Sequence, residues 1–195
     1  MQRRDFMLKT AALAATGLTV SACTTTATST TTPASSTAKQ HRDIDADVSE
    51  TIARLESTVK ESRELVNKAN GVLVFPSVLA AGLGIGGQYG EGALRVKNMK
   101  PEYYTLASLS VGLQIGAQSK AIIFLFMEQG ALDKFRSSEG WQAGADASVA
   151  VLKVGVNGNL DVTAASGPIL AFVLTNAGLM ANLTLEGTKI TRQKM

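Results

Sequence analysis

The sequence has little of the residues on which most enzyme sites depend. Its 195 residues include one histidine, His41, and one cysteine, Cys23. His41 lies at the edge of a Ser/Thr-rich segment, so histidine-based triads and multi-histidine metal sites are excluded. A single cysteine also excludes a disulfide within the chain. We therefore expect no enzymatic activity, no metal and no cofactor.

Long apolar runs and basic runs are absent as well. No stretch approaches about eighteen uninterrupted apolar residues, which argues against a transmembrane helix. Residues 1–22 hold three basic residues and one acidic residue. Without residues 1–22 the chain has 16 Lys and Arg and 15 Asp and Glu, and the net charge falls from +3 to +1. Because no run of basic residues alternates with aromatic ones, we expect no nucleic-acid partner.

Residues 1–22 have the pattern of an export signal. A basic start with Arg3 and Arg4 precedes a short apolar run at 11–20 and small residues before Cys23. The arginine pair, with Phe6 close behind, is typical of twin-arginine export, and Sec export is the alternative. These residues predict a signal peptide that is removed from the mature protein.

The four residues that end at Cys23, Val-Ser-Ala-Cys, resemble a bacterial lipobox. The resemblance implies cleavage before Cys23, acylation of its sulfur and amine with chains such as palmitate, and attachment to a membrane. The alternative is a buried free thiol in an N-terminal helix. Because Thr24 follows rather than aspartate, we expect an outer-membrane lipoprotein that faces the periplasm or the cell surface.

Residues 23–40 are predicted to be a lipidated tether, and residues 41–195 a single folded domain. Eleven of the seventeen residues from 24 to 40 are Ser or Thr, so this segment buries too little apolar surface to fold. The remaining 155 residues suffice for one domain with a substantial core.

Apolar residues at steps of mostly three and four predict one long helix over 43–69, which Asn70 and Gly71 end. This stripe is typical of a helix packed on a core, and a helix lying on a membrane surface is the alternative. A shorter helix is predicted over 129–137, with Leu132 and Phe135 facing inward.

Alternation with a period of two predicts strands over 82–97 and 103–118, joined as a hairpin. One phase of the first strand is rich in glycine, which allows close approach to the backbone. The glycines of this phase are Gly82, Gly84, Gly86, Gly90 and Gly92. Further strands are predicted at 72–75, 121–127, 140–151, 169–174 and 179–190, with a loop or helical turn at 77–81 and a tight turn at 157–158. The class is α+β, with a mainly antiparallel curved sheet or partly closed β-barrel, one long N-terminal helix and short helices.

Residues 82–87 match the dinucleotide motif G-x-G-x-x-G. That motif must open a helix after a strand, whereas the alternation here continues through residue 96. We therefore interpret these glycines as part of a strand and expect no nucleotide site.

Basic residues around the hairpin are candidates for contact with phosphate head groups of anionic lipids, because each cation near an anionic surface contributes about 1 kcal/mol. The candidates are Arg95, Lys97, Lys100 and Lys120. The alternative is ordinary solvated charge.

Five ordered strings resemble the SYLF-domain family. They are GVLVFP (71–76), GIGGQYGEG (84–92), GLQIGAQ (112–118), ALDKF (131–135) and GLMAN with LEG (178–187). The resemblance spans roughly 52–191 and implies a lipid-binding module, since eukaryotic members bind phosphoinositides and some bind actin. Where members commonly carry a lysine before the glycine that opens the glycine-rich strand, this chain has Ala80 and Ala81. An exported bacterial lipoprotein would not meet actin in its own cell.

These observations together predict a membrane-anchored lipoprotein with a non-enzymatic, phospholipid-binding domain at the cell envelope. The alternative is a structural or assembly module that binds an envelope protein.

Overall fold

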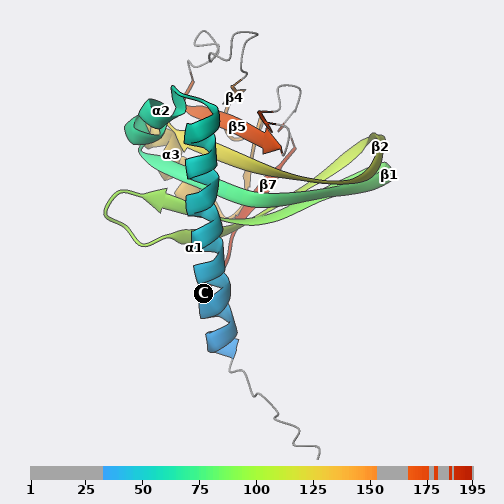
Figure 1. Cartoon of the computed structure of the whole chain (residues 1–195), viewed down its shortest axis with the longest axis horizontal. Helices are drawn as coiled ribbons and strands as arrows, with labels where there is room; N and C mark the ends of the chain where they lie inside the picture. The colour runs from blue at the N-terminus through green and yellow to red at the C-terminus, as the bar shows by residue number, and fades with distance from the viewer. Residues whose placement is uncertain (1–32, 153–166, 176–177, 180–184, 186, 195) are drawn as a thin grey trace, which may run out of the picture. The chain divides into compact units, whose positions relative to one another are not determined.

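The computed structural model describes residues 33–152, 167–175, 178–179, 185 and 187–194, with the backbone alone at 33–35, 82–85, 110–117 and 178–179. Cys23 and the turn predicted at 157–158 lie outside these ranges. Within them the chain forms three helices and seven strands (Figure 1). In chain order they are α1 (Pro33–Thr58), α2 (Ser62–Lys68), β1 (Gly71–Val96), β2 (Glu102–Phe126), α3 (Gln129–Ser137), β3 (Trp141–Gln142), β4 (Val149–Val151), β5 (Ile169–Thr175), β6 (Gly178–Leu179) and β7 (Lys189–Arg192).

The two longest strands, β1 and β2, form an antiparallel hairpin that organises the sheet. Their pairing runs from Gly71 opposite Phe126 to Leu94 opposite Glu102. The turn that joins them contains Asn98, whose φ of 62° is a left-handed conformation that asparagine tolerates well. Figure 1 shows both strands curving strongly along their length. As a result β5 pairs with the second part of β2, and β7 pairs with its first part.

The curvature brings the later part of β1 across its own earlier part. A Cβ at Gly92 would overlap the carbonyl oxygen of Val74 and lie 2.7 Å from Cδ1 of Phe75. A Cβ at Gly90 would lie 2.8 Å from Cγ2 of Val78. Side chains are therefore excluded at both positions, and glycine allows the two parts of the strand to come this close.

The sheet buries an apolar cluster on each face. On the inner face, alternate residues of β2 and β5 pack with Leu132 and Phe135 of α3 and with Trp141. On the outer face, the intervening residues pack against Val48 and Leu55 of α1. Residues 121–126 of β2 and 169–174 of β5 are buried on both faces, which confirms the interpretation of the run at 121–127.

Polar contacts fix α1 to the hairpin. The Arg95 guanidinium donates to the backbone oxygen of Asp45 at 2.7 Å and to the Ser49 hydroxyl at 2.9 Å. The Tyr103 hydroxyl donates to Asp45 Oδ2 at 2.9 Å. Burial, together with this hydrogen bond and the negative charge of Asp45, raises the pKa of Tyr103 to about 12. The ring of Tyr103 also stacks on His41, with centroids 3.6 Å apart.

The prediction of one helix over 43–69 is wrong in two respects. The helix begins at Pro33, inside the predicted tether, and it ends at Thr58 before α2 starts. Both the amide and the hydroxyl of Ser62 donate to the Val59 carbonyl, at 3.1 and 2.6 Å. That carbonyl would otherwise accept the next helical bond, so the helix stops and turns.

Two predicted features of the strands are also wrong. Residues 77–81 are neither loop nor helix, because β1 continues through Pro76 with a register shift between Phe75 and Val78. Proline has no N–H to donate, and a shift in the ladder accommodates it. The strand predicted over 140–151 is broken at Gly144, which has a φ of 85°. The amide of Gln142 donates to the Asp146 carboxylate and closes this turn.

The predicted class is confirmed. The molecule is an α+β protein with a long N-terminal helix and a mixed, strongly curled half-barrel sheet. Pairing is antiparallel except between β4 and β5. The short helix predicted over 129–137 is α3, and Leu132 and Phe135 are its buried residues.

The crossing of β1 predicts the cost of a side chain at Gly92. We expect Gly92→Ala to lower the free energy of unfolding by about 3 kcal/mol or more, because its Cβ meets backbone that cannot move aside. Gly130→Ala in α3 is the control, since nothing lies within 4 Å of a Cβ there. Urea denaturation of both variants measures the difference. Equal stabilities would contradict the close crossing.

Candidate functional site

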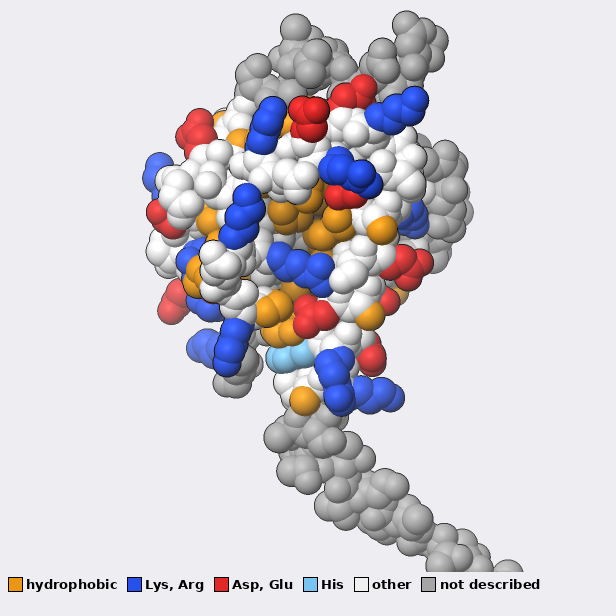
Figure 2. Space-filling model, turned by 60° about the vertical axis from the view of Figure 1, so that its left-hand side comes forward, with side chains coloured by type: hydrophobic (Ala, Val, Ile, Leu, Met, Phe, Trp, Pro, Cys, Tyr) orange, Lys and Arg blue, Asp and Glu red, His pale blue; other side chains and the backbone are white. Residues whose placement is uncertain are grey.

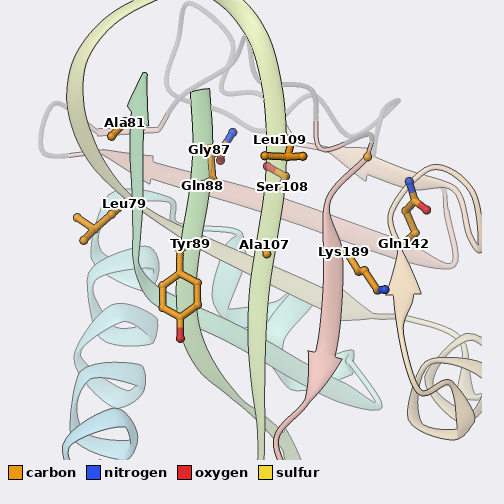
Figure 3. Close-up of a pocket in the computed structure, with 11 residues that line it drawn as sticks. Leu79, Ala81, Gly87, Gln88, Tyr89, Ala107, Ser108, Leu109, Gln142 and Lys189 are labelled. Atoms are coloured by element: carbon orange, nitrogen blue, oxygen red, sulfur yellow. The ribbon is translucent and has the colours of Figure 1, made fainter. Parts of the chain in front are cut away.

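The outer face of the hairpin carries an apolar groove of about 760 Å³. Figure 3 shows its residues on neighbouring strand segments, at 79–81 and 87–89 of β1, at 107–109 of β2, and around Gln142 and Lys189. The lining residues are Leu79, Ala81, Gly87, Gln88, Tyr89, Ala107, Ser108, Leu109, Gln142, Gly187 and Lys189.

Three large hydrophobic side chains in this groove are exposed. Their exposed fractions are 59% for Leu79, 52% for Tyr89 and 88% for Leu109. In the part of the chain whose side chains are described, the other large hydrophobic residue with this exposure is Met99, in the hairpin turn. A cluster of this kind on a protein surface marks a place where a membrane, a ligand or another protein binds.

The groove is the uncovered continuation of the face that α1 covers. Ala93 and Tyr103 belong to the cluster beneath α1, and the two-residue alternation leads from them to Tyr89 and Ala107 on the same face. Under α1 the apolar side chains of this sheet face are buried. Because α1 does not extend over the neighbouring part of the sheet, the apolar side chains there are exposed to solvent.

Polar groups edge the groove at two places. Lys189 pairs with Ala107 across the β2–β7 ladder. The Tyr89 hydroxyl donates to Glu91 Oε1 at 3.0 Å, and the Gln40 amide donates to Glu91 Oε2 at 2.8 Å. Partial burial and the nearby carboxylate raise the pKa of Tyr89, so this side chain is neutral at physiological pH.

The predicted head-group residues occupy three different environments. Lys97 and Lys100 both lie in the exposed hairpin turn beside Met99, and Lys97 also donates to the Asn67 carbonyl at 3.0 Å. The Arg95 guanidinium donates its hydrogen bonds to Asp45 and Ser49 of α1. Lys120 is only 7% exposed, opposite Val78 of the inner cluster, and burial lowers the pKa of its amine. The structure thus brings two of the four together.

Charge on the face seen in Figure 2 is mixed. Lys and Arg side chains alternate with Asp and Glu around a hollow in which hydrophobic side chains show. This agrees with the near balance of the two signs in the sequence.

The glycine motif at 82–87 lies within β1, as the alternation predicts. The interpretation as a strand rather than a nucleotide loop is confirmed. Gly90 and Gly92 lie at the crossing of β1, Gly86 is half-buried, and Gly82 and Gly84 are described by their backbone alone.

The sequence did not predict a buried ion-pair network around Glu102. Glu102, 7% exposed, accepts hydrogen bonds from Arg136 Nη2 at 2.6 Å and from the Tyr104 hydroxyl at 2.9 Å, and it forms an ion pair with Arg192 Nη2 at 3.1 Å. Glu102 lies far from both arginines in sequence, and no local pattern connects them. Burial alone would raise the pKa of Glu102, but the hydrogen bonds and charges of its partners outweigh this and hold the pKa below its usual value.

Within the described residues, no group of three or more His, Cys, Asp and Glu side chains is placed to hold a metal ion. None of the described helices is long and apolar enough to cross a membrane.

Comparison with protein families gives a match for the C-terminal part of the chain. Residues 107–195 match the family model Ysc84, which is described as a Las17-binding protein actin regulator. This segment belongs to the SYLF-domain family. Comparison with curated proteins gives no match. The SYLF match runs from the groove residue Ala107 through α3, β5 and β7, and it confirms the resemblance for this part of the chain.

The SYLF family is of a lipid-binding or actin-binding type. The matched segment contributes Ala107, Ser108, Leu109, Gln142, Gly187 and Lys189 to the groove.

The Glu102 network predicts a pH dependence of stability. Because the folded-state pKa of Glu102 lies below the ordinary 4.5, its stabilising contribution is present above pH 4.5 and is lost as the pH falls through the folded-state pKa. We expect Glu102→Gln to lower the free energy of unfolding at pH 7 by about 2–3 kcal/mol and to flatten its fall below about pH 5.

Urea denaturation from pH 7 to pH 3 measures both effects. Glu64→Gln is the control, because the exposed pair of Glu64 with Lys68, 3.7 Å apart, contributes little. A Glu102→Gln profile parallel to that of the unaltered protein would contradict the role of the network.

Proposed function

We propose that this chain is a membrane-anchored lipoprotein whose SYLF domain binds phospholipid at the cell envelope without catalysing a reaction. The observation that carries the proposal is the groove with exposed Leu79, Tyr89 and Leu109. The free energy falls when an apolar surface of this kind enters the boundary between lipid head groups and acyl chains.

The magnitudes favour a weak, reversible contact. Full burial of one leucine side chain contributes about 1.5–3 kcal/mol, and the three exposed groove residues are already partly covered. Such a contact suffices for membrane binding when a lipid anchor holds the domain near the membrane. The acyl anchor and the groove contact, each weak alone, together give stable attachment. Nine residues separate Cys23 from Pro33, so the two residues lie at most about 35 Å apart.

The basic residues of the proposal belong to two separate contacts. We assign Lys189 to the groove itself and Lys97 and Lys100 to a second contact, where they flank Met99, exposed to 47%, in the hairpin turn. Lysines beside an exposed apolar side chain suit a surface with anionic phosphates. Arg95 and Lys120 have structural roles in this version of the proposal.

A non-enzymatic role is supported by the position of the sole histidine, whose ring stacks on Tyr103 in the fold. In the proposed location the protein is exported and acylated at Cys23, with its domain facing the periplasm or the cell surface from the outer membrane. A structural or assembly role with an envelope protein partner is the alternative, favoured by the family's description as binders of the protein Las17.

Vesicle flotation tests the lipid-binding part. We expect the protein with Cys23→Ser, which removes acylation, to float with phospholipid vesicles at a lipid concentration high enough for the groove contact alone to hold a measurable fraction of it. Adding Leu79→Asp and Leu109→Asp should weaken the association at least tenfold, because a loss of about 1.4 kcal/mol already gives that factor. Ala46→Asp with Ala53→Asp, at two exposed positions of α1, adds the same two negative charges elsewhere and is the control.

Vesicle composition separates the two contacts. Lys97→Glu with Lys100→Glu should reduce flotation with phosphatidylglycerol vesicles and leave flotation with phosphatidylcholine vesicles unchanged. No flotation with either composition would refute lipid binding. A stoichiometric envelope protein that copurifies with such a non-floating protein would establish the alternative.

Membrane attachment in the cell is a separate prediction. Cys23→Ser should move the protein from the membrane fraction to the soluble fraction and remove labelling by a palmitate analogue. Thr24→Ser is the control, because it leaves the acylated residue in place. A Cys23→Ser protein that still fractionates wholly with membranes and retains the label would contradict the lipobox interpretation.

A further inference from the structure

A second cavity, of about 790 Å³, lies between the end of α3, with the residues that follow it, and the end of β7, with the residues that follow it. Its side chains include Arg136, Ser138, Glu139, Thr191, Arg192 and Lys194. It shares no lining residue with the apolar groove, and its character is polar and basic.

The two arginines of this cavity are held in place by one buried acid. Arg136 Nη2 and Arg192 Nη2 both contact Glu102 Oε1, at 2.6 and 3.1 Å. Two guanidinium groups that share one carboxylate carry one net positive charge. Lys194 adds a charge that Glu139 offsets, so the site as a whole remains cationic.

Both guanidinium groups also face solvent. The side chains of Arg136 and Arg192 are 27% and 45% exposed, whereas that of Glu102 is 9% exposed. A guanidinium has five N–H donors, of which the contacts with Glu102 use a part. Because Glu102 already fixes the two side chains, binding an anion costs little further ordering of rotamers.

Hydroxyl groups extend this set of donors. The Ser138 oxygen accepts a hydrogen bond from the Gly140 amide at 3.3 Å, so its own hydrogen is directed elsewhere. The end of α3 carries a partial negative charge, which Lys134 and Arg136 in its last turn offset. Paired arginines with nearby hydroxyls match the several acceptor oxygens of a phosphate group.

We propose that the cavity beside Arg136 and Arg192 is a binding site for a phosphate group, carried either by a small soluble phosphate ester or by a lipid head group. The site does not rest on the apolar groove, so phosphate binding stands even if the groove binds no membrane. Glu102 is its positioning residue, and the arginines make the contact.

Isothermal titration of the full chain with glycerol 3-phosphate measures the soluble form, and flotation with vesicles that contain phosphatidic acid measures the lipid form. Arg192→Gln should weaken binding at least tenfold, while Arg54→Gln, which removes an arginine from the exposed side of α1, should leave it unchanged. Lys194→Gln, which has no bond to Glu102 to lose, should weaken binding by a smaller factor without lowering the midpoint of thermal unfolding.

The two arms identify the source of the phosphate. Dependence on Arg192 in the titration alone assigns a soluble ester, and dependence in flotation alone assigns a head group. If Arg192→Gln and Arg54→Gln weakened phosphate binding equally, the effect would come from net charge alone, and the proposed site would be overturned. So would the absence of any Arg192-dependent binding in either arm while Arg192→Gln remains folded.

Discussion

The close crossing of β1 over itself is the contact on which the rest of the structure depends. Gly90 and Gly92 lie against the backbone from Val74 to Val78, with no room for a Cβ between the two parts of the strand. The crossing turns one long hairpin into two sides of a curled sheet. It gives α1 a surface composed of both parts of β1, and it encloses the aromatic cluster of the inner face.

The same alternation of residues produces both the buried core and the exposed groove. Under α1 the outer phase of the hairpin is covered, and Val74 and Ala93 are fully buried. Beyond the helix the same phase supplies Tyr89 and Leu109 to solvent. The extent of α1 therefore sets how much apolar surface of the sheet remains exposed to solvent. The buried core and the exposed groove are two parts of one sheet face.

Local pattern predicted the elements whose environment is uniform along their length. The apolar run at 121–127 and the spacing of Leu132 and Phe135 each specify burial through neighbouring residues, and both predictions are confirmed. The break after Thr58 depends instead on Ser62 competing for one carbonyl, and the crossing of β1 depends on the curvature of the whole sheet. The Glu102 network joins residues 34 positions apart through Arg136, so no window of sequence contains it. For the same reason the basic residues near the hairpin suggested one cluster, although the fold assigns Arg95 to the helix and Lys120 to the interior.

The placement of the polar contacts on α1 has a mechanical consequence. Gln40, His41, Asp45 and Ser49, all in the N-terminal part of the helix, make the bonds and the ring stack that join it to the hairpin. Ile44 and Val48 make apolar contacts among these polar ones, and Leu55 makes apolar contacts further along α1. Tension applied at Pro33, as by an anchored N-terminus, would load the polar contacts first. The apolar contacts of Leu55 would bear that force only after the hydrogen bonds around Asp45 had broken, so these bonds would protect the later part of α1 from a pull on its N-terminus.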